Sequence, residues 1–338
     1  MTHRRLVCAT LAMLVALGLA ACGEKKETTR EPATERVDLV LDYLPNADHA
    51  GIYAAIETGE FKHAALDVKP RTPSDPSAPL KLLASGKADL AISYEPELLL
   101  ARAKGAKLVS IGALVQRPLT SIISLGGKNA IRRAAELEGK KVGTAGIPYQ
   151  DAYLKTIMQH AGADPQRVKS VNVGFNLVPA LLTKRVDAVL GMFWNVEGVE
   201  LARRDRKPVI LRMDDVGVPT YDELVIVARE ADVRSRGPML RRFMRALARG
   251  HQQLRKDPDS GVDALVKANP DLKASLQRAQ VKATLPVFFP RDKTRPFGYQ
   301  RTLDWQRYAQ WMSENHVIPD AAIGQRAFTN EFLPGEGI

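Results

Sequence analysis

The amino-acid sequence predicts an α/β protein with mostly parallel sheets, divided into two lobes. Strand-like apolar runs alternate with helical stretches along most of the chain, and this rhythm is typical of parallel sheets covered by helices. Two extended segments, near 118–125 and 221–228, lie where one set of elements passes into the next. We therefore expect two α/β lobes joined by two hinge strands, with the C-terminal helices returning to the first lobe.

The first lobe opens with a predicted strand at 37–41, a run of Val and Leu interrupted only by one aspartate. The spacing of the apolar residues that follow predicts a helix over 47–58, which Gly59 closes. Further strands are expected at 66–68, 89–93 and 108–114, and further helices at 78–85 and 96–104.

The second lobe begins near Thr120. We expect strands at 121–125, 141–144, 171–173 and 188–191, and helices at 131–137, 151–161 and 177–184. The strongest β run of the chain, 224–228, then leads back to the first lobe. These elements place the first lobe at residues 36–120 plus 226–338 and the second lobe at 121–225.

The chain after that strand is mostly helical, and 240–254 is its clearest helix. Apolar residues recur there at helical spacing, while arginines fill most of the opposite face. Such a helix could lie on a membrane surface. We predict instead that it packs against the protein.

The N-terminus has the features of a lipoprotein signal. A basic head with Arg4 and Arg5 precedes an apolar run, 6–19, that is short for a transmembrane helix. Leu-Ala-Ala-Cys at 19–22 resembles the bacterial lipobox, in which the thiol receives a diacylglycerol and cleavage leaves that cysteine first. The alternative is an ordinary signal peptide with an incidental cysteine.

We accordingly expect residues 1–21 to be a signal peptide and Cys22 to carry the lipid. The charged, Thr-rich stretch 22–35 is expected to be a flexible tether. The protein would then sit in the cell envelope, anchored to the membrane through lipidated Cys22 and facing the periplasm.

Composition narrows the function classes. The chain has 338 residues, enough for two lobes, and its two cysteines exclude a disulfide-rich scaffold or a cysteine-built zinc ribbon. The net charge of +11 would permit nucleic-acid binding, but export makes nucleic acid an unexpected partner. The positive charge either holds the folded body near anionic lipid or only keeps its surface solvated.

We expect the protein to be a monomer.

The common catalytic and cofactor motifs are absent from the sequence. The six histidines are scattered without a His-x-x-x-His pair, no Gly-x-Gly-x-x-Gly follows a strand, and there is no Gly-x-Ser-x-Gly elbow. We therefore expect no metal, no cofactor and no catalytic residue. A binding protein is favoured over an enzyme.

Aromatic, amide and acidic side chains gather where strands end, which is where open α/β sheets bind ligands. Rings can stack on the faces of a flat, nitrogen-rich ligand, while acids and amides hydrogen-bond to its edge. The candidate ligand-binding residues are Tyr43, Asn46, Tyr94, Glu95, Tyr149, Trp194, Asn195, Glu197 and Tyr221.

Each candidate also has a simpler interpretation. The aromatic residues could belong to the core, and Glu95 and Glu197 could be solvated. His49 is expected on a helix surface rather than in contact with a ligand, and Asp151 could serve only to cap its helix.

Five blocks of sequence, in order, carry a resemblance to a known family. These blocks, 43–46, 74–82, 89–96, 142–151 and 191–195, resemble the pyrimidine-precursor-binding proteins of thiamin uptake, in the NMT1/THI5-like group of periplasmic binding proteins. The resemblance runs from about residue 37 to 290. It implies a type II periplasmic-binding-protein fold and delivery of a 4-amino-2-methylpyrimidine, commonly formylaminopyrimidine, to an ABC permease with its ATPase.

The family's binding loops carry over to the following positions of this chain: Tyr43, Asn46, Tyr94, Glu95, Tyr149, Trp194 and Glu197. Where relatives commonly have Trp before the Pro-Asn pair, this chain has Tyr43 and Leu44. That substitution changes the ring available for stacking.

Three alternatives remain open. A binding protein for alkylsulfonate or nitrate should place Arg or Lys in the cleft. The fungal relatives that synthesise the pyrimidine carry a Cys-Cys-Cys-Phe-Cys motif, whereas this chain has no cysteine after Cys22. A sensory or structural lipoprotein would not deliver a ligand to a permease.

Overall fold

The computed structural model describes residues 33–335 of the protein. The expected signal peptide, the lipidation site Cys22 and most of the expected tether lie outside the described residues. All the elements below belong to one unit of the chain, Thr34–Ile338.

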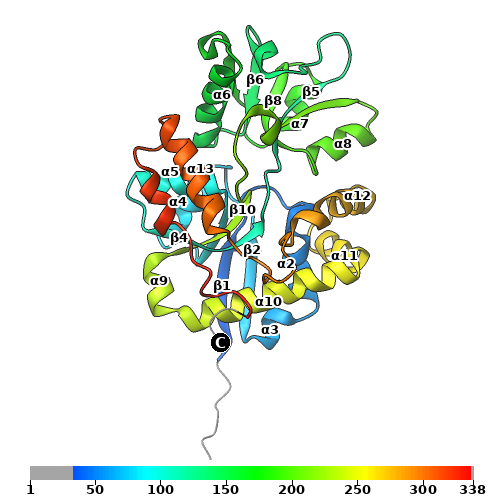
Figure 1. Cartoon of the computed structure of the whole chain (residues 1–338). Helices are drawn as coiled ribbons and strands as arrows, with labels where there is room; N and C mark the ends of the chain where they lie inside the picture. Colours follow the sequence, from blue (N-terminus) through cyan, green and yellow to red (C-terminus); the bar gives the residue numbers. More distant parts are fainter. Residues whose placement is uncertain (1–32, 336–338) are drawn as a thin grey trace, which may run out of the picture. The chain divides into compact units, whose positions relative to one another are not determined.

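The first sheet has five strands in the order β2-β1-β3-β10-β4 (Figure 1). Its strands are β1 (Glu35–Val40), β2 (Leu66–Arg71), β3 (Leu90–Ser93), β4 (Leu108–Val115) and β10 (Leu224–Arg229). Strand β1 runs parallel to β2 and β3, whereas β10 runs antiparallel to β3 and β4. Because β10 lies between β3 and β4, the late segment of the chain completes the sheet begun by the N-terminal residues.

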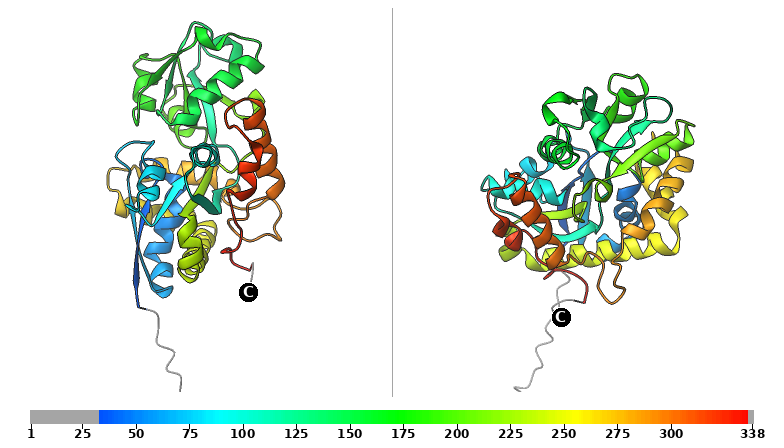
Figure 2. Two further views of the ribbon diagram at one scale, coloured as in Figure 1. Left: turned by 90° about the vertical axis from the view of Figure 1, so that its left-hand side faces the viewer. Right: turned by 45° about the horizontal axis from the view of Figure 1, so that its top comes forward.

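Helices connect and cover this sheet. They are α2 (Ala50–Glu57), α3 (Glu60–His63), α4 (Pro79–Ala84), α5 (Glu95–Ala103), α9 (Glu230–Ser235), α10 (Gly237–Lys256), α11 (Pro258–Ala268), α12 (Ala274–Thr284) and α13 (Thr302–Glu314). Short 3₁₀ turns accompany them at η1 (Ala47–His49), η5 (Leu285–Val287) and η6 (Ala321–Arg326). Figure 2 shows α13 beside the strands that connect the two sheets. The hydroxyl group of Tyr308, on α13, contacts that of Tyr153.

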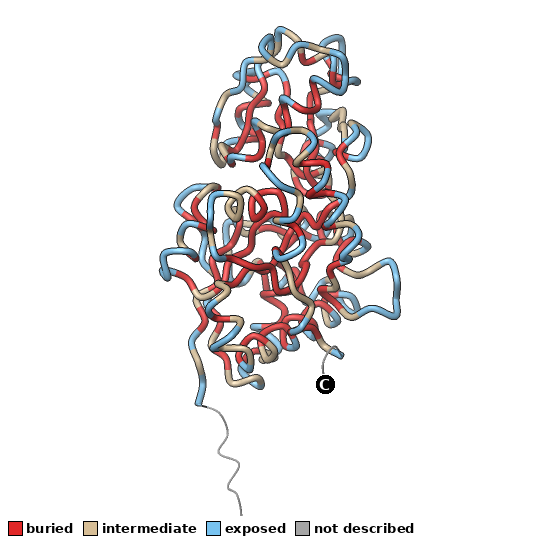
Figure 3. Tube along the Cα trace, turned by 60° about the vertical axis from the view of Figure 1, so that its left-hand side comes forward, coloured by how far each residue is buried: buried red, intermediate tan, exposed pale blue. Residues whose placement is uncertain are grey.

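The second sheet, green in Figure 1, also has five strands, in the order β7-β6-β8-β5-β9. They are β5 (Thr120–Leu125), β6 (Lys141–Thr144), β7 (Lys169–Asn172), β8 (Ala188–Phe193) and β9 (Pro208–Arg212). Helices α6 (Pro148–His160), α7 (Leu177–Leu182) and α8 (Glu197–Arg203) accompany it, with turns η2 (Ala134–Leu137), η3 (Pro165–Arg167) and η4 (Asp214–Val216). Buried residues follow the strands of both sheets (Figure 3).

Two segments of the second sheet differ from the sequence prediction. The helix expected over 131–137 is only the turn η2. The N–H of Ile131 donates to Oγ of Ser124 at 2.9 Å, which ties the start of that segment to β5 before a helix can begin. Strand β9 was not predicted; it is a partly exposed edge strand, antiparallel to β5.

Helix α10 packs against α2, as the sequence predicted for 240–254. At Gly51 and Gly250 the two helices touch closely, because an added Cβ on either glycine would overlap the facing helix. His251 lies in this contact fully buried, and burial lowers the pKa of its imidazole to about 4. Within the described part of the chain, none of the helices has the length and apolar content needed to cross a bilayer.

The chain passes between the two sheets twice, from β4 to β5 and from β9 to β10, and one carboxyl group joins these two connecting segments. The N–H groups of Leu119 and Thr120 donate to Oε2 of Glu223 at 2.6 and 2.7 Å, and the Thr120 hydroxyl donates to Oε1 at 2.8 Å. Glu223 immediately precedes β10, while Leu119 precedes β5 and Thr120 begins it. This buried contact joins the starts of the two hinge strands.

Candidate ligand-binding site

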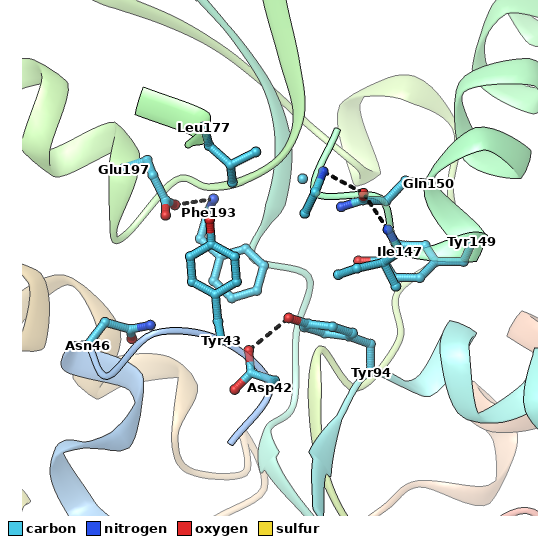
Figure 4. A pocket seen from close by; sticks show the side chains of 12 residues that line it. Asp42, Tyr43, Asn46, Tyr94, Ile147, Tyr149, Gln150, Leu177, Phe193 and Glu197 are labelled. Atoms are coloured by element: carbon cyan, nitrogen blue, oxygen red, sulfur yellow. Dashed lines mark hydrogen bonds between the residues drawn. The ribbon is translucent and has the colours of Figure 1, made fainter. Parts of the chain in front are cut away.

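A narrow cavity of about 20 Å³ lies where strand ends of the two sheets face each other (Figure 4). This volume is well below that of an occupied small-molecule site, so a ligand would have to move the walls of the cavity apart. From the lobe of the first sheet it is lined by Asp42, Tyr43, Asn46 and Tyr94, and from the lobe of the second sheet by Ala145, Ile147, Tyr149, Gln150, Leu177, Gly191, Phe193 and Glu197. The predicted candidates Tyr43, Asn46, Tyr94, Tyr149 and Glu197 are thus brought together.

Aromatic rings form much of the cavity wall. The ring of Tyr94 lies 5.7 Å from that of Tyr149 and 6.3 Å from that of Phe193, centroid to centroid. Tyr43 stands opposite, edge-on to Phe175 at 4.9 Å. Burial, followed by the nearby carboxyl groups of Glu197 and Asp42, raises the pKa of Tyr43, so its hydroxyl stays protonated. Rings supplied by both lobes suit a flat ligand held between them.

The first polar wall is a buried hydrogen-bond network around Asp42. Its Oδ2 accepts the hydroxyl of Tyr94 at 2.8 Å, and its Oδ1 is paired with Nε2 of His49 at 2.9 Å. Nδ1 of His49 accepts the N–H of Asn46, which places the proton of the neutral ring on Nε2. His49 is therefore fully buried, which corrects the prediction that it lies on a helix surface.

The local sequence explains this geometry. Asp42 follows β1 at the carboxyl edge of the sheet, and Asn46 caps the turn η1 by accepting the N–H of Asp48 at 2.8 Å. His49 is the third residue of that turn, so its ring can accept the N–H of Asn46, the capping residue. The cap, the turn and the network orient Asp42 and Tyr94 before any ligand binds.

The second polar wall comes from Glu197 at the start of α8. Its Oε2 accepts the N–H of Phe193 at 2.7 Å. Glu197 lines the cavity, yet burial raises the pKa of its carboxyl group to about 8. The hydrogen bond from the Phe193 N–H lowers this pKa, but its effect is smaller than that of burial. The carboxyl group is therefore mostly protonated at neutral pH and can both donate and accept hydrogen bonds.

Gln150 supplies an amide to the cavity, on the side away from Glu197 (Figure 4). Its Oε1 accepts the N–H of Ala145 at 2.9 Å and that of Ile147 at 3.3 Å, which holds the side chain in place. Figure 4 shows its Nε2 directed toward the middle of the cavity. Gly191, with φ of +106°, lies against this amide, and a Cβ there would overlap Nε2.

Trp194 and Asn195 do not line the cavity. The indole N–H of Trp194 donates to the carbonyl of Pro118 at 3.1 Å, and the guanidinium of Arg212 lies 4.3 Å from its ring centroid. Asn195 is fully buried, and its Nδ2 donates to Oδ1 of Asp48 at 2.6 Å. Both side chains join parts of the protein around the cavity.

Glu95 and Tyr221 lie in the hinge rather than at the cavity. Oε2 of Glu95 accepts the N–H of Asp222 at 2.7 Å, and burial with the nearby Asp222 carboxyl raises the pKa of Glu95 well above its usual range. The Tyr221 hydroxyl donates to Glu223 at 3.1 Å, and its ring packs on Tyr308. These groups stabilise the connection between the two lobes.

Three important lining residues, Asp42, Gln150 and Phe193, were not among the predicted candidates. Asp42 directly follows the first strand, and this position was a usable signal. Gln150 stands next to the predicted Tyr149, and Phe193 next to the predicted Trp194. Within residues 33–335, no three His, Cys, Asp or Glu side chains are grouped so that they could hold a metal ion.

The two mixed sheets, the paired crossings and the cavity between strand ends define the class: this is the type II periplasmic-binding-protein fold, as predicted. The structure resembles the alkanesulfonate-binding protein SsuA from Xanthomonas axonopodis pv. citri, with a TM-score of 0.69 over 88% of this chain and 99% of that chain. The sequences are 16% identical, so this likeness establishes the fold alone.

Sequence comparisons give the family. The family described as NMT1/THI5 like matches residues 46–261. The formylaminopyrimidine-binding protein of Halalkalibacterium halodurans is 32% identical over 94% of this chain and 96% of that protein. The chain belongs to the NMT1/THI5-like family. A 4-amino-5-hydroxymethyl-2-methylpyrimidine phosphate synthase of Legionella pneumophila is 26% identical over 88% of this chain and 92% of that protein, so similar chains include enzymes.

Proposed function

We propose that this chain is a lipid-anchored solute-binding protein that captures a 4-amino-2-methylpyrimidine precursor of thiamin. It would deliver that ligand from the periplasmic side to an ABC permease with its ATPase. The observation that carries the proposal is the pairing of aromatic walls with the carboxyl group of Glu197 in one cavity. The 32% identity to a formylaminopyrimidine-binding protein supports the choice of ligand.

The chemistry of the cavity fits the edge of an aminopyrimidine. Such a ring presents an amino donor beside a ring nitrogen that accepts. A protonated Glu197 offers the complementary pair, because its hydroxyl can donate to the nitrogen while its carbonyl oxygen accepts from the amino group. Tyr43, Tyr94 and Phe193 would contact the ring faces, with stacking worth about 1–3 kcal/mol for each ring engaged.

The charge of the cavity argues against the alkylsulfonate or nitrate alternative. Its lining residues include Asp42 and Glu197 but no lysine or arginine. An anionic ligand would then meet carboxyl groups without a compensating cation. The synthase alternative is disfavoured because the sequence has no cysteine after Cys22, and hence no Cys-Cys-Cys-Phe-Cys motif.

Isothermal titration calorimetry tests the ligand directly. We expect heat on adding 4-amino-5-hydroxymethyl-2-methylpyrimidine or its formylaminomethyl analogue to the purified chain, and none with an alkanesulfonate or nitrate. The variant Tyr94→Phe, which removes the hydroxyl that orients Asp42, should bind more weakly than the parent. Binding of the sulfonate, with neither pyrimidine bound, would overturn the ligand while leaving the fold unchanged.

Mass spectrometry of the protein from its native membrane tests the anchor. We expect the chain to begin at Cys22 with a diacylglycerol on its sulfur, and Cys22→Ser to leave the membrane fraction. A mature chain without lipid would refute the anchor without affecting the pyrimidine assignment. Loss of pyrimidine uptake on deleting a neighbouring permease gene would support the delivery step.

A further inference from the structure

A second depression, of about 490 Å³, lies beside the chain crossings and shares no lining residue with the aromatic cavity. Its walls come from the link between β4 and β5, the segment before β10, the loop that joins α12 to α13, and α13 itself (Figure 1). We call it the arginine groove, after the five arginines that line it: Arg117, Arg291, Arg295, Arg301 and Arg307. Gln116 also lines it. The proposed pyrimidine function makes no use of it.

Hydrogen-bond donors exceed acceptors in the arginine groove. Five arginines line it against three aspartates, and the aspartates already have local partners. Asp222 accepts the indole N–H of Trp305 at 2.8 Å, Asp292 accepts from Thr294, and Asp304 is paired with Arg301 at 3.4 Å. The carboxylates therefore leave most of the guanidinium groups without a counter-charge.

Three of the arginines lack an acidic partner. Among the residues that the structure describes, no ion pair involves Arg117, Arg291 or Arg307. Arg117 makes one side-chain hydrogen bond there, to the carbonyl of Pro286 at 2.8 Å. Burial, with the nearby guanidinium groups of Arg291 and Arg212, lowers the pKa of Arg117, so like charges converge at this point.

Gln116 adds an independent indication of a missing acceptor. Its Nε2 is buried and has no hydrogen-bond acceptor within residues 33–335. Buried donors are normally satisfied, and an unpaired amide beside converging guanidinium groups marks a place for a bound oxygen acceptor. A tetrahedral oxyanion can accept from donors that approach from several directions, as the groove presents them.

We propose that the arginine groove is a binding site for a phosphate-bearing ligand, held by Arg117 and Arg291 with the amide of Gln116 as a further donor. The ligand carries at least two negative charges, because the two arginines that would hold it, Arg117 and Arg291, have no acidic partner among the described residues. Its phosphate belongs either to a free small molecule or to a lipid headgroup, and the recognition chemistry is the same for both.

The test uses the purified full chain and inorganic pyrophosphate as the probe, measured by titration calorimetry. The variants are Arg117→Gln and Arg291→Gln; Arg291 is exposed, so its replacement should leave the fold intact. Arg245→Gln is the matched control, because Arg245 is an exposed arginine of α10 outside the groove. We expect each groove variant to weaken pyrophosphate binding about tenfold or more, and the control to leave it unchanged.

A second arm separates the two sources of phosphate. Flotation with phosphatidylcholine vesicles, with and without phosphatidylglycerol, uses the same variants after removal of the N-terminal anchor. Groove-dependent binding of pyrophosphate supports a free phosphate ligand, and groove-dependent flotation alone supports a lipid headgroup. The proposal is overturned if neither probe binds, or if Arg245→Gln lowers binding as much as the groove variants do.

Discussion

Nδ2 of Asn195 lies 2.6 Å from Oδ1 of Asp48, so a single buried hydrogen bond joins the loop after β8 to the turn after β1. The same Nδ2 lies 2.6 Å from the hydroxyl oxygen of Thr284, at the end of α12. Within the described chain, Oδ2 of Asp48 and Oδ1 of Asn195 remain without partners. Burial raises the pKa of Asp48 to about 7, so this carboxyl holds a proton over much of the neutral range.

The buried carboxyl of Asp48 makes stability depend on pH. Its pKa is raised from 3.8 to about 7 on folding, so between these values the folded chain holds a proton that the unfolded chain has released. The free energy of unfolding should therefore fall as pH rises through this range, by at most about 1.4 kcal/mol per pH unit from this group. Asp48→Asn should show a smaller fall in urea unfolding between pH of about 5 and about 8.

Other groups contribute in the same direction, so the slope should be reduced but not abolished. Burial also raises the pKa of Glu97, Asp222 and Glu223 to about 7 each. Asp151→Asn is the control, because Asp151 is exposed and should leave the slope unchanged. An equal slope in the parent chain and in Asp48→Asn would contradict the assignment to Asp48.

Gly191 should be essential to the shape of the aromatic cavity. Gly191→Ala places a side chain at φ of +106° and pushes the Gln150 amide away from the cavity. Gly86→Ala is the matched control, because Gly86 has φ of +73° but an added Cβ would meet nothing within 4 Å. Both variants should lose about 1–2 kcal/mol of stability to the backbone. Only Gly191→Ala should also lose pyrimidine affinity in calorimetry, and equal affinity in the two variants would argue against the role of Gln150.

The carboxyl group of Glu223 should hold the hinge strands together, because it accepts hydrogen bonds from buried N–H groups. Glu223→Ala leaves the N–H groups of Leu119 and Thr120 without an acceptor and should cost about 2–4 kcal/mol in chemical denaturation. Glu223→Gln keeps one oxygen for them, and its amide can donate to the Thr120 hydroxyl. The glutamine variant should therefore stay close to the parent, and equal losses in both variants would refute this account.

Pyrimidine binding should weaken in alkaline solution if Glu197 acts as a protonated carboxyl group. Its pKa is raised to about 8, and above that pH the affinity should fall about tenfold per unit as the donor is lost. Glu197→Gln retains one donor and one acceptor at every pH, so it should bind with little pH dependence. Calorimetry from about pH 6 to about pH 10 measures both profiles; an affinity that stays constant in the parent chain would exclude the protonated form.

The sequence predicted much of the site because strand ends can be located from apolar runs. Tyr43, Tyr94 and Tyr149 each follow or begin an element at the carboxyl edge of a predicted sheet, and all three line the cavity. The apolar pattern could not predict which of two neighbouring residues, such as Phe193 and Trp194, lines the cavity. Successive side chains at the end of a strand point to opposite sides, so Phe193 faces the cavity while Trp194 turns to Arg212.

The sequence alone determined the α/β class, the two lobes and the strand ends that carry rings and acids, because apolar periodicity and local turn chemistry are encoded residue by residue. Only the tertiary structure decided that Asp42 and Gln150 enter the cavity, that Glu95 and Tyr221 stabilise the hinge, and that Glu197 carries a proton. These outcomes depend on burial and on contacts between segments far apart in the sequence, such as that of Glu95 with Asp222, which local patterns do not contain. The cavity is therefore a property of how the two sheets meet.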